Sequence, residues 1–131
     1  MICLDTNVLV RYLAQDEPKQ AALATCLIES LTTDEPGFIS HVVLAETLWV
    51  LESCYAADPA RVQQVVDALL RTSGVLVERA ESVWRALRQF KQSDGDFADT
   101  LIAVSARDAG CRAIYTFDKG AAKRSGMTLL A

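Results

Sequence analysis

The sequence has a single histidine, His41, and no two cysteines in a Cys-X-X-Cys pair. A zinc site usually needs clustered nitrogen and sulfur ligands, so we do not expect one. A chain of 131 residues can bury a core without a disulfide framework. We therefore expect buried, reduced thiols at all four widely spaced cysteines, which are Cys3, Cys26, Cys54 and Cys111.

The sequence also lacks long apolar runs, and its first residues lack the basic and apolar regions of a secretory signal. Hydrophobic residues make up 51% and charged residues 23% of the chain, which is typical of a globular protein. We expect one soluble domain over residues 1–131, without a membrane span, that remains in the cytoplasm.

The chain has no excess of positive charge, because 13 basic residues face 17 acidic ones and the net charge is −4. Taken globally, this balance argues against a nucleic-acid partner. The excess of acidic residues is compatible with a nucleic-acid partner if these residues are concentrated in one cation-binding site. If four acids form that site, the remaining chain carries as many basic as acidic residues.

Short apolar runs alternate with longer helical segments along the chain. We expect strands over residues 2–4, 38–40, 75–77, 113–117 and 127–130. We expect helices over residues 7–14, 18–31, 42–54, 59–71, 80–90, 97–109 and 120–124. This alternation predicts an α/β fold with a short central parallel sheet of about four to five strands, flanked by helices.

Four acidic residues stand at unusual places in this pattern. Asp5 and Asp118 each follow a strand, Glu46 lies inside the apolar run VVLAETLWVL, and Asp99 opens the helix in GDFADTLIAV. Each position also has a structural explanation. Asp5 and Asp118 suit helix N-caps, Glu46 suits the exposed edge of its helix, and Asp99 with Asp96 suits a capping box.

Taken together, the four acids favour a cation-binding site over four separate structural roles. Ligands bind at the carboxyl ends of parallel strands, and a central first strand would bring all four carboxylates together. At about 4 Å and an effective dielectric constant of 20, each like-charged pair costs about 4 kcal/mol, so the cluster needs a proton or a cation. Ligands that are all oxygens select hard ions such as Mg²⁺ or Mn²⁺.

The segments LDTNVLVRYL, HVVLAETLWVL, DFADTLIAVSA and YTFDKGA together resemble the PIN-domain ribonucleases. Within that family the chain is similar to the VapC-type toxins of type II toxin–antitoxin systems, over nearly its whole length. The resemblance implies a three-layer α/β fold and cleavage of RNA with one or two Mg²⁺ or Mn²⁺ ions. It also implies inhibition by a cognate antitoxin protein.

The resemblance places the four catalytic and metal-binding acids at Asp5, Glu46, Asp99 and Asp118. The residues beside them that would support the site are Thr6, Asn7, Asp96 and Thr116. Asp96 matches an additional acid of some members, and capping is the alternative role. Basic residues near these acids would form a rim that contacts the RNA phosphates. They are Arg11, Lys119, Lys123 and Arg124.

A water activated by the metal would leave a 5′-phosphate and a 3′-hydroxyl, since no histidine pair supports a cyclic-phosphate route. A housekeeping RNA-processing nuclease and a non-catalytic binding module of the same fold are the alternatives. A receiver domain would need an adjacent acidic pair after an early strand. An aspartyl phosphatase would need a second acid two residues after Asp5, where the chain has Asn7.

The amphipathic helices also carry large apolar side chains that suit either the core or an interface. A homodimer or antitoxin contact is the functional interpretation, and ordinary core packing is the structural one. The residues concerned are Leu48, Trp49, Tyr55 and Trp84.

Overall fold

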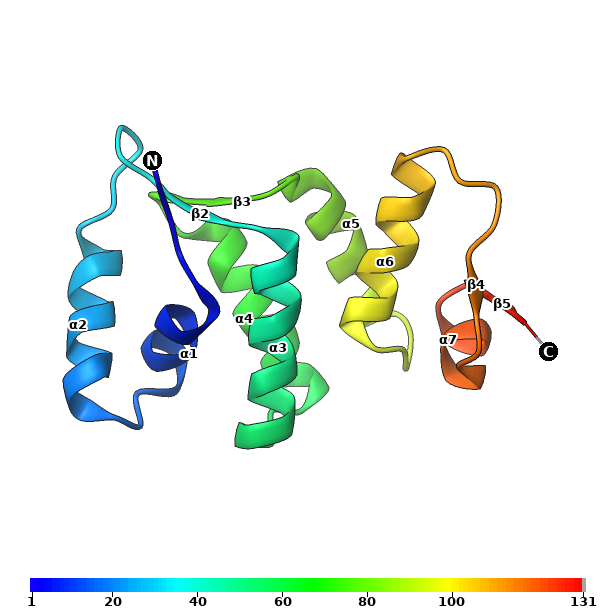
Figure 1. Ribbon diagram of the computed structural model, residues 1–131, viewed down its shortest axis with the longest axis horizontal. Coiled ribbons are helices and arrows are strands. Elements are labelled where there is room, and N and C mark those ends of the chain that lie inside the picture. The colour runs from blue at the N-terminus through cyan, green and yellow to red at the C-terminus, as the bar shows by residue number, and fades with distance from the viewer. Residues whose placement is uncertain (131) are drawn as a thin grey trace. The chain divides into compact units, whose positions relative to one another are not determined.

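The computed structural model describes residues 1–130, and its chain divides into two compact units, Met1–Glu78 and Arg79–Ala131 (Figure 1). The prediction of one domain over residues 1–131 includes residue 131, which lies outside the described residues. That prediction stays a prediction. No helix in residues 1–130 has the length and apolar character that a membrane crossing requires.

The first unit contains a parallel sheet in the order β1-β2-β3, with Ile2 opposite Gly37 and Gly37 opposite Val75. Its strands are β1 (Ile2–Cys3), β2 (Gly37–Ile39) and β3 (Val75–Val77). Its helices are α1 (Thr6–Ala14), α2 (Pro18–Glu29), α3 (His41–Tyr55) and α4 (Pro59–Arg71). The strand order makes β1 an edge strand of this sheet.

Helix α1 packs against both α2 and α3, and α4 packs against β3 (Figure 1). Leu4 and Ile39 are buried where β1 and β2 end, and Leu9 and Leu44 are buried on the helices that follow. Burying such a side chain contributes about 1.5–3 kcal/mol. The core therefore fixes the ends of β1 and β2 relative to the starts of α1 and α3.

The second unit contains α5 (Ala80–Lys91), α6 (Phe97–Asp108), β4 (Tyr115–Thr116), α7 (Lys119–Arg124) and β5 (Thr128–Leu129). Helices α5 and α6 pack together, and the rings of Phe90 and Phe97 meet edge to face with centroids 5.5 Å apart. Strands β4 and β5 are parallel, with Tyr115 opposite Thr128, and α7 packs on both.

Within residues 1–130, every expected strand and helix is present, and the ends differ by no more than two residues. The α/β class with parallel strands is confirmed. Hydrogen bonds join the strands into two sheets, one in each unit.

The expectation of buried cysteines was wrong, because Cys3, Cys26, Cys54 and Cys111 are all exposed free thiols. Cys3 lies on an edge strand whose two residues are both exposed. In α2, the buried face consists of Ala21, Ala24 and Ile28, and Cys26 lies outside it. The average preference of cysteine for the interior did not hold at these surface positions.

Candidate active site

Asp5 is held where β1 gives way to α1. The preceding residue, Leu4, is buried in the core, whereas Asp5 is exposed and has extended backbone dihedral angles. Its Oδ1 accepts a hydrogen bond of 2.8 Å from the N–H of Thr6, so Asp5 is the N-cap of α1. The predicted cap is therefore confirmed, and it fixes the direction of the carboxylate at the strand end.

Glu46 lies on the exposed side of α3, and the hydroxyl of Thr6 donates a hydrogen bond to its Oε1. The neighbouring residues Leu44, Thr47 and Leu48 are buried. Glu46 therefore lies on the outward face of α3, as expected for a glutamate at the exposed edge of its helix. The same position lets Glu46 bond to the first turn of α1, beside Asp5.

Asp5, Thr6 and Glu46 line one cavity of about 390 Å³ in the first unit. The remaining lining comes from α1 and α3, and consists of Asn7, Val10, Arg11, Val50, Cys54 and Tyr55. The cavity therefore brings together two of the four predicted acids, with Thr6 as the hydrogen-bonded link between α1 and α3.

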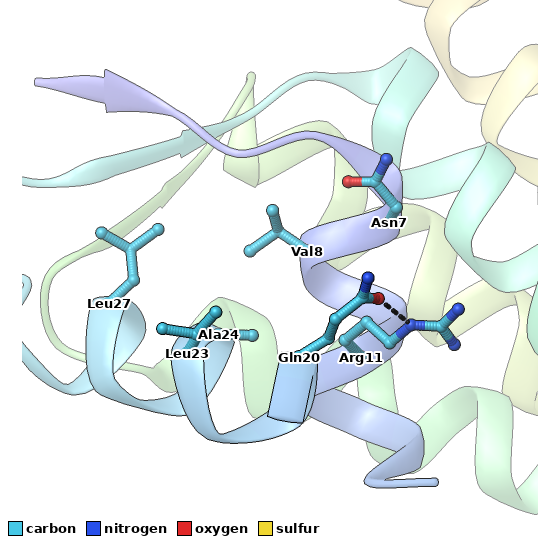
Figure 2. A pocket seen from close by; sticks show the side chains of 7 residues that line it. All are labelled: Asn7, Val8, Arg11, Gln20, Leu23, Ala24 and Leu27. Atoms are coloured by element: carbon cyan, nitrogen blue, oxygen red, sulfur yellow. Dashed lines mark hydrogen bonds between the residues drawn. The ribbon is translucent and has the colours of Figure 1, made fainter. Parts of the chain in front are cut away.

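Arg11 lines this cavity, but its guanidinium is already engaged. Its Nε donates to Gln20 Oε1 at 2.7 Å (Figure 2), and its Nη1 lies 3.4 Å from both Asp16 Oδ1 and the hydroxyl oxygen of Tyr55. The Tyr55 hydroxyl donates to Asp16 Oδ2 at 2.7 Å, which lowers the pKa of Asp16. The sequence did not single out Asp16, because no pattern marks a loop carboxylate that pairs with a tyrosine on a distant helix.

Asp96 and Asp99 form the start of α6 in the second unit. Asp96 is the N-cap, and its Oδ1 accepts a hydrogen bond of 3.1 Å from the N–H of Asp99. The predicted capping geometry is confirmed. The half-buried Asp99 carboxyl has a raised pKa, first because it is partly removed from water, and then because Asp96 and Asp118 carry like charges nearby.

Asp118 is the N-cap of α7, and its Oδ1 accepts hydrogen bonds from the N–H groups of Gly120 at 2.7 Å and Ala121 at 3.2 Å. The hydroxyl oxygen of Thr116 accepts a bond of 3.0 Å from the N–H of Asp118. Thr116 therefore supports the turn that presents Asp118, and its accessory role in the site stays a prediction.

The carboxylates supply only oxygen ligands, which suits Mg²⁺ or Mn²⁺. Within each unit taken alone, residues 1–130 contain no group of three or more acids, histidines or cysteines placed to hold a metal ion. Asp5 and Glu46 come from the first unit, and Asp99 and Asp118 from the second. Convergence of all four carboxylates stays a prediction.

The basic residues predicted for the rim on α7 are exposed, and none forms an ion pair within residues 1–130. They are Lys119, Lys123 and Arg124. All three side chains are therefore free to contact a phosphate, whereas Arg11 is tied to Gln20 and Asp16.

Comparison with known proteins identifies the family. The family described as PIN domain matches residues 2–126, a range that includes all four acids. A VapC ribonuclease from Aquifex aeolicus (strain VF5) is 26% identical over 119 residues, which cover 91% of this chain and 88% of the relative. The chain belongs to the PIN-domain family.

Proposed function

We propose that the protein is the toxin of a toxin–antitoxin pair, a VapC-type endoribonuclease that hydrolyses RNA phosphodiester bonds with Mg²⁺ or Mn²⁺. The similarity to the VapC ribonuclease of Aquifex aeolicus supports this proposal. The observation that carries it is the Thr6 link, which places Glu46 beside Asp5 in one cavity of the first unit.

Asp5, Glu46, Asp99 and Asp118 would hold the divalent cation. When bound, such a cation neutralises charge on the phosphoryl oxygens and lowers the pKa of water, so that hydrolysis proceeds at neutral pH. Thr6 orients Glu46, and Thr116 supports the turn at Asp118. Partial burial and the like charges of Asp96 and Asp118 raise the pKa of Asp99, and a bound cation would offset this repulsion.

The RNA strand would approach the acids through the free basic residues of α7, which are Lys119, Lys123 and Arg124. Because these side chains have no carboxylate partners, they can pair with backbone phosphates. Hydrolysis by water would leave a 5′-phosphate and a 3′-hydroxyl.

The antitoxin would bind the groove between α1 and α2, which has a volume of about 520 Å³ (Figure 2). Leu23 and Leu27 line this groove and are 69% and 37% exposed. Asn7 and Arg11 line both the groove and the cavity of Asp5 and Glu46. An apolar partner helix in the groove could therefore extend a basic side chain toward these acids.

A homodimer in the cytoplasm is part of the same proposal. Leu48 is buried and belongs to the core, so it does not contribute to a contact surface. Trp49 is 65% exposed on α3 and is available for one. The molar mass measured by light scattering tests whether a second copy is bound.

The test uses purified protein and expression without a partner. RNA should be cleaved with Mg²⁺ and not with EDTA, and expression of the wild type alone should stop growth. Asp5→Asn should abolish both effects with the fold intact, because asparagine caps a helix about as well as aspartate. Asp34→Asn is the matched control, since Asp34 is an exposed acid outside the candidate site.

The alternatives give different results. A housekeeping nuclease would cleave RNA with Mg²⁺ without stopping growth. A non-catalytic binding module would neither cleave RNA nor respond to Asp5→Asn.

A further inference from the structure

A cavity of about 280 Å³ in the second unit contains basic and polar groups but no carboxylate. Its lining comes from the C-terminal end of α5, from α6 and from the end of α7. Arg107, Arg124 and Ser125 line it, together with the amide side chains of Gln89 and Gln92. Such a set of donors suits an anion.

Neither arginine of this cavity has a partner in residues 1–130. Arg85, by contrast, is bonded to both carboxylate oxygens of Asp108, at 2.6 and 2.8 Å. Arg107 and Arg124 form no ion pair and no side-chain hydrogen bond in the described chain. Both lie in the last turn of a helix, where the helix dipole favours a cation. The helix dipole explains why each arginine lies at the end of its helix. It does not explain why both arginines line the same cavity.

Ser125 is a second, independent sign of a ligand. The residue is only 8% exposed, and its Oγ is a buried atom with no hydrogen-bond partner in the described residues. Its own N–H is bonded to the carbonyl oxygen of Ala121, so the hydroxyl is the donor of this residue that has no partner in the described residues. Buried hydroxyl groups nearly always have partners, because losing water without replacement is costly.

The position of Arg124 relates the cavity to Asp118. Its Nη1 lies 3.4 Å from the point that a Cβ on Gly120 would occupy, and the N–H of Gly120 donates to Asp118 Oδ1. Asp118 Oδ1 lies 3.1 Å from the same point, so the Arg124 guanidinium reaches back from the end of α7 toward Asp118. Arg107, by contrast, lies about 12 Å along α6 from Asp99, so a phosphate paired with Arg107 is distinct from one at the acids.

We propose that this cavity is a subsite for a backbone phosphate of the RNA substrate, separate from the phosphate that is cleaved. The guanidinium groups of Arg107 and Arg124 pair with its oxygens, and the Ser125 hydroxyl donates to one of them. The subsite rests on the proposed ribonuclease function and adds a fixed contact that positions the strand relative to Asp118.

The experiment measures binding rather than cleavage. The full chain is titrated against a fluorescently labelled single-stranded RNA oligonucleotide in EDTA, at several salt concentrations, and the affinity is read from fluorescence anisotropy. For single strands, each phosphate contact contributes about 0.7 to the slope of log affinity against log salt. Arg107→Gln should weaken binding several-fold and make this slope shallower by about 0.7.

Ser125→Ala separates ligand binding from folding. It should weaken RNA binding without changing the slope, because the hydroxyl carries no charge. It should not lower the thermal unfolding midpoint, since the hydroxyl has no partner in the described chain. Arg112→Gln is the matched control, an exposed arginine of the same unit outside the cavity, and it should change neither quantity.

Equal affinities and slopes for Arg107→Gln and Arg112→Gln would overturn the subsite, as would a wild type that binds no RNA. A wild type that binds RNA with the expected response to Arg107→Gln, but never cleaves it with Mg²⁺, would support the subsite and contradict the ribonuclease. A lower unfolding midpoint in Ser125→Ala would assign the hydroxyl to the fold instead.

Discussion

Thr6 donates its hydroxyl hydrogen to Glu46, which lies 40 residues further along the chain. The bond joins the first turn of α1 to α3 and holds the carboxylate of Glu46 in the cavity that Asp5 also lines. Thr6→Val keeps the shape of the side chain and removes this donor. We expect a loss of about 10- to 100-fold in cleavage rate or Mn²⁺ affinity, which is usual for groups that orient metal ligands.

Rate measurements and Mn²⁺ titrations check the role of Thr6. Thr72→Val serves as the control, because the Thr72 hydroxyl bonds only to the carbonyl oxygen of Ala68 in its own helix end. If Thr6→Val retained the wild-type rate and metal affinity, the orienting role of Thr6 would be wrong.

Asp96 and Asp99 should differ in their effect on cleavage. Asp96→Asn should keep most of the activity and change the free energy of unfolding by no more than about 0.5 kcal/mol, since asparagine also caps helices. Asp99→Asn should be severely impaired, because it loses a charged ligand. The comparison requires cleavage rates and denaturant unfolding of both variants, and an equal loss of activity would place Asp96 among the metal ligands.

Removing the metal should reveal the cost of the Asp99 charge. Its raised pKa means that the folded chain binds a proton more tightly than the unfolded chain, so stability falls as pH rises through this raised pKa. In EDTA at neutral pH, Asp99→Asn should therefore unfold at a higher temperature than the wild type. Adding Mn²⁺ should stabilise the wild type and not the variant.

Thermal unfolding followed by circular dichroism, with and without EDTA, measures both effects of Asp99→Asn. Asp94→Asn is an informative control, because Asp94 is an exposed acid five residues away with no ion pair in the described chain. A destabilised Asp99→Asn variant in EDTA would show that Asp99 contributes to the fold rather than opposing it.

Asp108 should control the stability of the second unit in acid. Hydrogen bonds from Arg85 and Ser82 lower its pKa from 3.8 to about 2. A lowered pKa contributes stability that is present above pH 3.8 and is lost as pH falls toward 2. Asp108→Asn should therefore unfold more easily than the wild type at neutral pH, and the difference should disappear near pH 2.

Denaturant unfolding at a series of pH values tests this dependence. Asp67→Asn, which removes the partner of Arg71 in a more exposed pair on α4, should show a much smaller change. A difference between Asp108→Asn and the wild type that persisted unchanged at pH 2 would contradict the role of the ionised carboxylate.

Leu23→Glu should weaken the antitoxin without affecting the enzyme. Leu23 is 69% exposed in the groove between α1 and α2, so the change should cost little stability and leave RNA cleavage intact. Co-expression with the antitoxin should then fail to restore growth. Leu76→Glu changes an exposed leucine of β3 outside the groove and should still be rescued. Full rescue of both variants would exclude this groove as the binding site.

The sequence predicts the elements well because the apolar spacing changes clearly between strands and helices. It predicts orientation poorly where a helix is apolar all round, as in α3. There the buried face contains Leu44, Leu48 and Leu51, while Val42 and Trp49 are exposed beside Glu46. Periodicity alone could not show which face of α3 points outward. The exposure of Glu46 depends on which face that is.

The acids themselves were recognisable from their places after strands and at helix starts. Their partners were not, because contacts between distant segments leave no local pattern. The bonds from Thr6 to Glu46 and from Tyr55 to Asp16 each join residues about forty positions apart. The orphan hydroxyl of Ser125 was equally hidden, since a serine after a short helix usually suggests only a turn.

The exposed thiols offer a practical means of observing the candidate site. Cys54 lines the same cavity as Asp5 and Glu46, whereas Cys3, Cys26 and Cys111 do not. Replacing those three by serine would leave one attachment point for a fluorescent or spin label beside the acids. The same exposure means that oxidising buffers favour disulfide-linked aggregates of the unmodified chain, so its preparations require a reducing agent.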